Sequence, residues 1–326
     1  MKSYLPIVFV MALLAIVPFV TASNVVLNFL VTTFLIALAG QGWNLLGGYG
    51  GQYSFGHAAF FGTAAYATAI LQVRYGINAW LGLVAGILAG ALMGATIGAL
   101  CFRSGLRGSY FSLVTLAFAE VLRIISSVAP ITGAGVGTLI KLDLRPEAFQ
   151  FQSRVPFYWI ILTLLALSLM AVRATENSRF GAYLVAIREN EDAASALGIN
   201  TFAVKLMAMT ISAAITSAAG CFYAQYFLFI DAAIAYGPRV SIDALLAPIV
   251  GGAGTLFGSL FGALAIKTLG EATKLLTGEA PGLDLVVYGV LLIAVVGFLR
   301  RGIAGLMAAL VPRRFRKTLP AEREHA

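Results

Sequence analysis

Charged residues are so scarce in this sequence that each one inside an apolar segment is a candidate for chemistry. Glu120 and Arg123 stand three residues apart in the apolar segment 109–129. That spacing puts both side chains on one face of a helix, where they can pair. Charges at membrane depth usually face the interior of a bundle, because lipid does not solvate them. The pattern predicts either a structural ion pair or two residues that line a solute path.

A polar stretch flanked by glycines, G-Q-Y-S-F-G-H at 51–57, interrupts two apolar segments. Backbone that is not helical inside a membrane must be buried in protein or line a cavity, because lipid cannot satisfy its N–H and C=O groups. Gln52, Ser54 and His57 are therefore candidates for contact with a polar solute. The alternative is that they only satisfy the broken backbone.

Signatures of enzymes and metal sites do not occur in the sequence. It contains no G-x-x-x-x-G-K-[ST] loop, so the chain has no nucleotide site of this type. Cys101 and Cys221 lie in apolar segments without companion ligands, which indicates neither a metal site nor a disulfide. We expect no enzyme activity, no cofactor and no metal.

The stretch 186–200, A-I-R-E-N-E-D-A-A-S-A-L-G-I-N, is charged and rich in alanine. It follows the rules of a capped helix, with Asn190 at the N-cap, Glu191 and Asp192 in the first turn and Gly198 at C′. Its apolar face, formed by Ala193, Ala194 and Leu197, is shallow and suited to docking in a groove. We predict a short helix that either docks on a partner or is a solvated connector.

The elements that position these residues are membrane helices. The sequence is 60% hydrophobic and 11% charged, with a mean hydropathy of +0.91, as in integral membrane proteins. The predicted fold is all-α, a polytopic transmembrane helical bundle of about 9–10 segments with broken or re-entrant segments, in a single domain over 1–326. We expect crossings at 5–22, 25–46, 56–73, 79–101, 109–129, 155–173, 203–228, 256–270 and 283–299, and a broken or re-entrant segment at 241–250 around Pro248.

The distribution of Lys and Arg predicts the orientation. With the N-terminus inside, the cytoplasmic side receives roughly twice as many as the outer side, where Arg239 and Lys267 are placed, so both termini are expected in the cytoplasm. The longest cytoplasmic loop is then 174–202. The net charge of +8 reflects this bias and a basic tail at 300–326 beside anionic lipid, not nucleic-acid binding. The first segment is either a retained helix or a signal peptide cleaved after Ser23.

Glycines recur every four residues at positions 82, 86, 90, 94 and 98. Small residues at this spacing let neighbouring helices approach closely in lipid. The stripe predicts tight packing, either within this chain or against a second subunit.

Four blocks of the sequence resemble one family, the permease subunits of branched-chain amino-acid ABC importers, LivM type. They are G-Q-Y-S-F-G-H-A-A-F-F-G-T-A-A-Y (51–66), T-L-A-F-A-E-V-L-R (115–123), residues 186–200 and G-G-A-G-T-L-F-G-S-L-F-G-A (251–263). They follow in the expected order over most of the chain between 40 and 270.

The resemblance implies that 186–200 is a cytoplasmic coupling helix. Importer permeases carry an E-A-A-x-x-x-G loop that binds the ATPase subunit, and here Asp192 stands at the Glu position, while the downstream I-x-L-P is absent. The implied ATPase-coupling residues are Arg188, Glu189, Glu191, Asp192, Ala193, Ala194, Leu197 and Gly198.

The resemblance also implies partners and a location. The partners are a homologous LivH-type permease in a heterodimer, two ABC ATPase subunits and a periplasmic solute-binding protein, in a bacterial inner membrane. Leucine, isoleucine and valine are the expected solutes, with urea, amides and aromatic acids left open.

Two other classes compete with this interpretation. A self-sufficient secondary transporter driven by an ion gradient would use Glu120 or His57 as its coupling site. A membrane scaffold without transport fits poorly with a polar break at membrane depth.

Overall fold

The computed structural model describes residues 3–21, 23–277 and scattered positions between 282 and 303. The long helices are α1 (Leu5–Val20), α2 (Asn24–Trp43), α3 (His57–Tyr75), α4 (Ala79–Arg103), α5 (Gly108–Val128), α6 (Val155–Glu176), α9 (Thr201–Phe227), α11 (Pro238–Gly251) and α12 (Gly258–Thr277). The short elements are the π-helix η1 (Asn44–Tyr49), α7 (Arg179–Glu189), α8 (Glu191–Ala196), α10 (Ala232–Ala235), and the strands β1 (Thr138–Leu139) and β2 (Phe229–Ile230). Three 3₁₀ turns lie in the loop between α5 and α6, at Pro130–Thr132, Ala134–Val136 and Pro146–Ala148.

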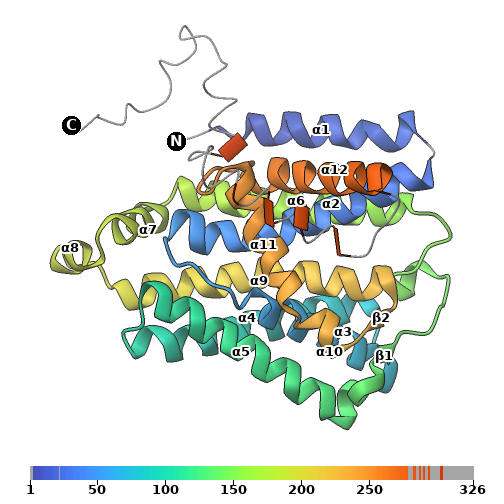
Figure 1. Cartoon of the computed structure of the whole chain (residues 1–326), viewed down its shortest axis with the longest axis horizontal. Coiled ribbons are helices and arrows are strands. Elements are labelled where there is room, and N and C mark those ends of the chain that lie inside the picture. The colour runs from blue at the N-terminus through green and yellow to red at the C-terminus, as the bar shows by residue number, and fades with distance from the viewer. Residues whose placement is uncertain are drawn as a thin grey trace, which may run out of the picture.

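Most of the long helices lie side by side in one bundle (Figure 1). In the described part, six segments are long and apolar enough to cross a membrane: Asn24–Tyr49, Ala79–Arg103, Gly108–Val128, Val155–Glu176, Thr201–Phe227 and Ala232–Gly251. The antiparallel pair of β1 and β2 is the only sheet among these residues. The prediction of an all-α polytopic membrane bundle is confirmed.

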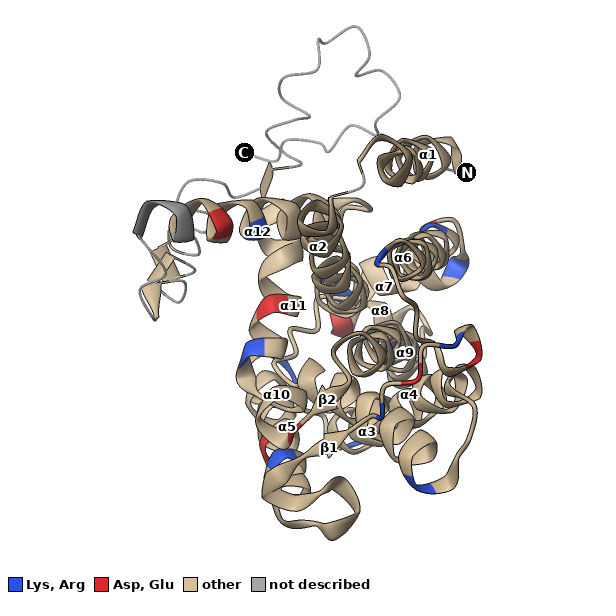
Figure 2. Ribbon diagram, turned by 90° about the vertical axis from the view of Figure 1, so that its right-hand side faces the viewer, with Lys and Arg blue, Asp and Glu red and all other residues tan. Residues whose placement is uncertain are grey.

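The two ends of the bundle differ. The helices α7 and α8 project from one end, which we call the α8 end, and β1 and β2 lie at the other, the β end (Figure 1). Figure 2 views the bundle from the β end, and most of its helices carry few charged residues.

The segment around Pro248 is longer than the ten residues expected, and α11 continues through Pro248 instead of breaking there. Its helix runs over Ala232–Gly251 and is interrupted between α10 and α11 at Tyr236 and Gly237. Pro238 then restarts the helix at its first turn, where its missing N–H has no helical partner to lose.

The helix α12 is longer than the crossing expected at 256–270. The helix α12 continues to Thr277, beyond the expected end at 270, so Lys267 lies in the middle of the helix. The expected crossing at 283–299 and the basic tail at 300–326 lie largely outside the described residues.

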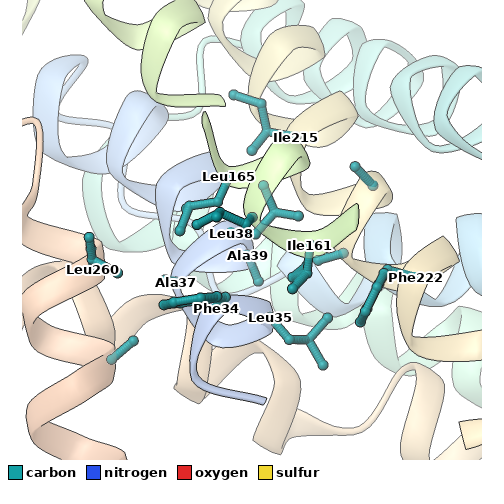
Figure 3. Packing of buried hydrophobic residues seen from close by; sticks show 14 of the residues in the cluster. Phe34, Leu35, Ala37, Leu38, Ala39, Ile161, Leu165, Ile215, Phe222 and Leu260 are labelled. Atoms are coloured by element: carbon teal, nitrogen blue, oxygen red, sulfur yellow. The ribbon is translucent and has the colours of Figure 1, made fainter. Parts of the chain in front are cut away.

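The largest buried apolar cluster surrounds α2. Figure 3 shows Phe34 of α2 among side chains that include Ile161 of α6, Phe222 of α9 and Leu260 of α12. In lipid, apolar side chains gain little from leaving the solvent, so such contacts stabilise the bundle through close packing. This packing holds α2 in the centre, next to the break at 50–56.

The glycine stripe of α4 packs within this chain, which is one of the two alternatives that the sequence allows. All five glycines are buried. A Cβ atom on Gly86 would lie 2.8 Å from the Ala64 carbonyl oxygen of α3, and one on Gly98 would lie 3.0 Å from Met209 of α9. The stripe therefore brings α4 into contact with α3 and α9.

Candidate functional site

The helix α8 forms with the caps that the sequence predicts. The Asn190 side chain accepts a hydrogen bond from the Ala193 N–H at 2.9 Å. At the other end, the Gly198 N–H bonds to the Ser195 carbonyl and the Ile199 N–H to the Ala194 carbonyl, with Gly198 at φ +86°. This is the Schellman arrangement, in which a left-handed residue satisfies the last carbonyls of a helix. Both ends of this six-residue helix are therefore capped.

The apolar face of α8 is smaller than the sequence suggests. Ala194 is buried against the neighbouring helices, so it does not belong to an outward face with its two predicted companions. Ala193 is exposed, and Leu197 is 83% exposed. Leu197 is therefore accessible to a partner.

Ion pairs attach α8 to two membrane helices. Glu191 contacts Lys205 of α9 at 2.5 Å and Arg107, at the start of α5, at 3.3 Å. Asp192 accepts a second bond from Arg107 at 2.9 Å. The Lys205 side chain is 3% exposed and that of Glu191 14%. A displacement of α8 would therefore pull on α5 and α9 together.

The electrostatics of this attachment keep Arg107 charged. The hydrogen bond that Arg107 donates to Asp192, with the nearby charge of Glu191, raises the pKa of the Arg107 guanidinium above its ordinary value. An arginine is already protonated at every physiological pH, so the attachment does not titrate through Arg107.

The predicted coupling residues Arg188 and Glu189 lie at the end of α7. They pair with each other at 2.8 Å, and Glu189 remains mostly exposed. Arg188 also donates from Nη1 to the Gly48 carbonyl oxygen at 3.2 Å. Gly48 itself lies against Gly254, since a Cβ on Gly48 would lie 3.1 Å from the Gly254 Cα. Arg188 thus joins α7 to the place where two glycine-rich stretches, 47–56 and 251–258, meet.

The break at 50–56 is partly buried: Ser54 and Gly56 are buried, whereas Tyr53 is 51% exposed, and side chains from other helices satisfy part of its backbone. The Trp43 indole N–H donates to the Ser54 carbonyl at 2.8 Å, and the Ser112 hydroxyl donates to the Tyr53 carbonyl at 2.5 Å. The Phe55 N–H donates to the Thr115 hydroxyl at 3.2 Å. The membrane helices α2 and α5 therefore supply the partners that lipid cannot.

The three candidate solute contacts of this stretch differ in exposure. Gln52 is half-buried and bonds to the Gly50 carbonyl. Ser54 is buried and accepts from the Gly56 N–H. His57 is buried with its Nε2 3.0 Å from the Ser212 hydroxyl, and its Nδ1 has no partner among the described residues. Contact of these residues with a solute stays a prediction.

Glu120 and Arg123 form the ion pair that their spacing predicts, but they do not point into the bundle. The two side chains share two hydrogen bonds, at 2.6 and 2.9 Å. The Glu120 side chain is 44% exposed and that of Arg123 34%. They lie on the exposed side of α5, which we call its open side. The expectation of an inward orientation is wrong, because the buried side of α5 carries Ser112, Thr115 and Ala119 instead.

Lys205 and Arg107 belong to the site although the sequence did not select them. Both stand out only as basic residues near helix ends, and topology explains such residues equally well. Their distances from Glu191 along the chain are 14 and 84 residues, so only the fold brings them together.

Comparison with known proteins finds that the chain is similar to permeases of transport systems. Residues 25–296 match the family described as "Branched-chain amino acid transport system / permease component". The chain is 29% identical to the high-affinity branched-chain amino acid transport system permease protein LivM of Escherichia coli, over 82% of this chain and 68% of the relative. The LivM protein of Salmonella typhimurium gives the same values. The xylose transport system permease protein XylH of Haemophilus influenzae is 29% identical over 43% of this chain and 38% of the relative. No solved structure matches.

Proposed function

We propose that this chain is a membrane subunit of an ABC importer for branched-chain or related amino acids. The reason is that it belongs to the family of permease components of branched-chain amino acid transport systems. Two LivM proteins among its relatives support the choice of solute. The partial likeness to a xylose permease indicates that this type of permease also serves other solutes. The bacterial inner membrane is the corresponding location, and the whole chain acts as one permease domain.

The observation that carries the proposal is the construction of α8. A solvated connector needs neither two caps nor a leucine that is 83% exposed beside them. In the proposed importer, α8 lies in a groove of an ATPase subunit, with Leu197 as its apolar anchor and Asp192 at the rim. The α8 end is then cytoplasmic, and a solute-binding protein approaches the β end.

The ion pairs of α8 give the proposed coupling a physical route. When the ATPase subunits close on ATP, they move α8. The Glu191 contacts carry that motion to α9 through Lys205 and to α5 through Arg107. Arg188 carries it to the glycine-rich stretches at 47–56 and 251–258. A rigid helix on ionic contacts transmits force in a way that a flexible loop does not.

A second, homologous permease covers the open side of α5 in this proposal. The helix is long and apolar enough to cross the membrane, yet it holds the half-exposed Glu120–Arg123 pair on that side. Lipid does not solvate such charges, whereas a second permease or a water-filled path between the two subunits can solvate them. We place Glu120 and Arg123 beside the solute path, with Gln52, Ser54 and His57 further inside the chain.

The subunit assignment is tested with the purified chain alone in liposomes. We expect neither uptake of leucine nor hydrolysis of ATP, because the chain has no phosphate-binding loop. Addition of the ATPase subunits, the second permease and the loaded binding protein should restore both. Uptake driven by an ion gradient in the single chain would favour the alternative, a self-sufficient secondary transporter.

The position of Glu120 leads to a second test. The substitution Glu120→Gln keeps the shape of the side chain but leaves Arg123 without its counter-charge. We expect normal membrane insertion, with reduced co-purification of the second permease and reduced solute uptake. Asp143→Asn is the matched control, since it removes the acid of the Asp143–Arg145 pair in the outer loop. Wild-type assembly and uptake in Glu120→Gln would exclude this side of α5 as the interface.

A further inference from the structure

A pocket at the β end has no role in the function proposed above. It has a volume of about 510 Å³, within the roughly 300–1,000 Å³ of sites that bind small molecules. The second turn of α2, the first turn of α6, the last turn of α9 and the loop before α6 line it. In Figure 2, α3 lies between α5 and α9, and the last turn of α9 lines the pocket. The pocket is therefore distinct from the proposed permease interface.

One side of the pocket holds a fixed arginine. The Arg154 guanidinium donates from Nη1 to the Asn28 side-chain oxygen and to the Tyr226 hydroxyl, each at 2.5 Å. It also lies over the Tyr226 ring, 5.7 Å from the centroid. The Nε and Nη2 atoms of Arg154 donate to none of the described residues. Among those residues, no carboxylate lines the pocket. A guanidinium held at one nitrogen presents the others to a carboxylate or phosphate group.

Another lining residue provides an acceptor. Gln225 is fully buried and donates from Nε2 to the Gln72 side-chain oxygen at 2.6 Å. Its Oε1 atom has no hydrogen-bond partner among the described residues. Buried polar atoms are nearly always satisfied, so this one indicates a missing donor. An ammonium group would supply that donor.

The rest of the lining is part apolar and part polar. Leu144, Phe151 and Phe157 are among its apolar residues, and Gln150, Gln152 and Ser153 are its other polar ones. A ligand that suits this lining has an anionic group, a nearby ammonium group and an apolar body.

We propose that this pocket binds such a zwitterion, with its anionic group on Arg154 and its ammonium directed to Gln225. Two sources share this chemistry: a free amino acid with an apolar side chain, and the headgroup of an ethanolamine phospholipid from the surrounding membrane. The amino-acid source rests on the proposed function, whereas the lipid source does not.

The test uses the purified full-length chain in its permease complex. Leucine binding is measured by calorimetry, and retained ethanolamine phospholipid by native mass spectrometry, with phosphatidylglycerol for comparison. Arg154→Gln removes the charged fork, and Leu144→Trp fills the pocket from a half-exposed position in the loop without touching a charge. Arg145→Gln is the matched control, because this nearby arginine pairs with Asp143 and does not line the pocket.

The proposal expects one of the two ligands to bind the wild type and the control, and to be lost or weakened at least tenfold in both test variants. Loss of leucine binding identifies the amino-acid source, and loss of ethanolamine lipid identifies the lipid source. Absence of both ligands from the wild type, or binding that survives either test variant, overturns the proposal.

Co-purification of the ATPase subunits, measured in the same samples, separates this proposal from the proposed function. A pocket that binds neither ligand, in a complex that still contains the ATPase subunits, defeats only the pocket. A chain that never retains ATPase subunits defeats the proposed function, and the lipid measurement still tests the pocket.

Discussion

Replacing Leu197 by glutamate is expected to remove the ATPase subunits from the purified complex, or to leave them bound with hydrolysis that loaded binding protein no longer stimulates. Leu197 is 83% exposed at the end of α8, so its substitution removes few contacts within this chain. In an ATPase groove, the same position would place an uncompensated carboxylate in an apolar contact. Central anchors of an interface contribute 2 kcal/mol or more, which corresponds to at least about a thirtyfold loss of affinity.

Gly198→Val is the companion variant, and it acts through the backbone. Gly198 has φ +86°, and no neighbouring atom would contact an added Cβ. The effect is therefore not a clash but the strain of a β-branched residue in a left-handed conformation, about 1–2 kcal/mol. We expect the C-terminal turn of α8 to unwind and coupling to weaken, with membrane insertion unchanged.

Leu197→Met is the control for both variants, since it keeps an apolar anchor of similar volume. The measurements are co-purification of the ATPase subunits and ATP hydrolysis in the presence of loaded binding protein. If Leu197→Glu and Gly198→Val both assemble and respond like the wild type, α8 is an ordinary loop and the coupling assignment fails.

The features of α8 that could be predicted are those encoded within a few residues. Asn190 and Gly198 act on backbone groups one turn away, so the sequence alone identifies both caps. The pairing of Glu120 with Arg123 is local in the same sense. The long helices follow from the length of their apolar runs, and a family resemblance in four blocks connects them to a function.

The features that could not be predicted depend on which helices meet. Ala194 turns inward because α7 and α9 lie beside α8, and nothing within 186–200 encodes this. Glu120 and Arg123 lie on the open side of α5 because the neighbouring helices pack against the side that carries Ser112 and Thr115. The pocket around Arg154 needs Asn28, which is 126 residues away along the chain. Long-range packing decides all three.

The buried attachment of α8 provides the other large expected effect. The substitution Glu191→Gln removes the charge that faces Lys205, whose side chain is 3% exposed. A lysine left buried without its partner destabilises a protein strongly, by about 3–5 kcal/mol. We expect a lower yield of folded chain and, in the folded fraction, ATP hydrolysis that no longer responds to loaded binding protein. Thermal unfolding in detergent and stimulated hydrolysis measure the two effects.

Arg107→Gln is the matched control, because it breaks the other ionic contact of Glu191. The Arg107 side chain is 53% exposed, and solvent screens such pairs, so the loss of stability should not exceed about 1 kcal/mol. An equal loss in both variants would mean that burial of Lys205 does not determine the effect.

The double variant Glu191→Leu with Lys205→Met separates stability from coupling. Replacing a buried ion pair by apolar residues of similar volume is often neutral or stabilising, so most of the folding loss should be recovered. The ionic link from α8 to α9 is nevertheless gone, and stimulated hydrolysis should stay low. Recovery of stability together with full stimulation would show that α8 transmits motion by packing alone, and the ionic route through Lys205 would have to be abandoned.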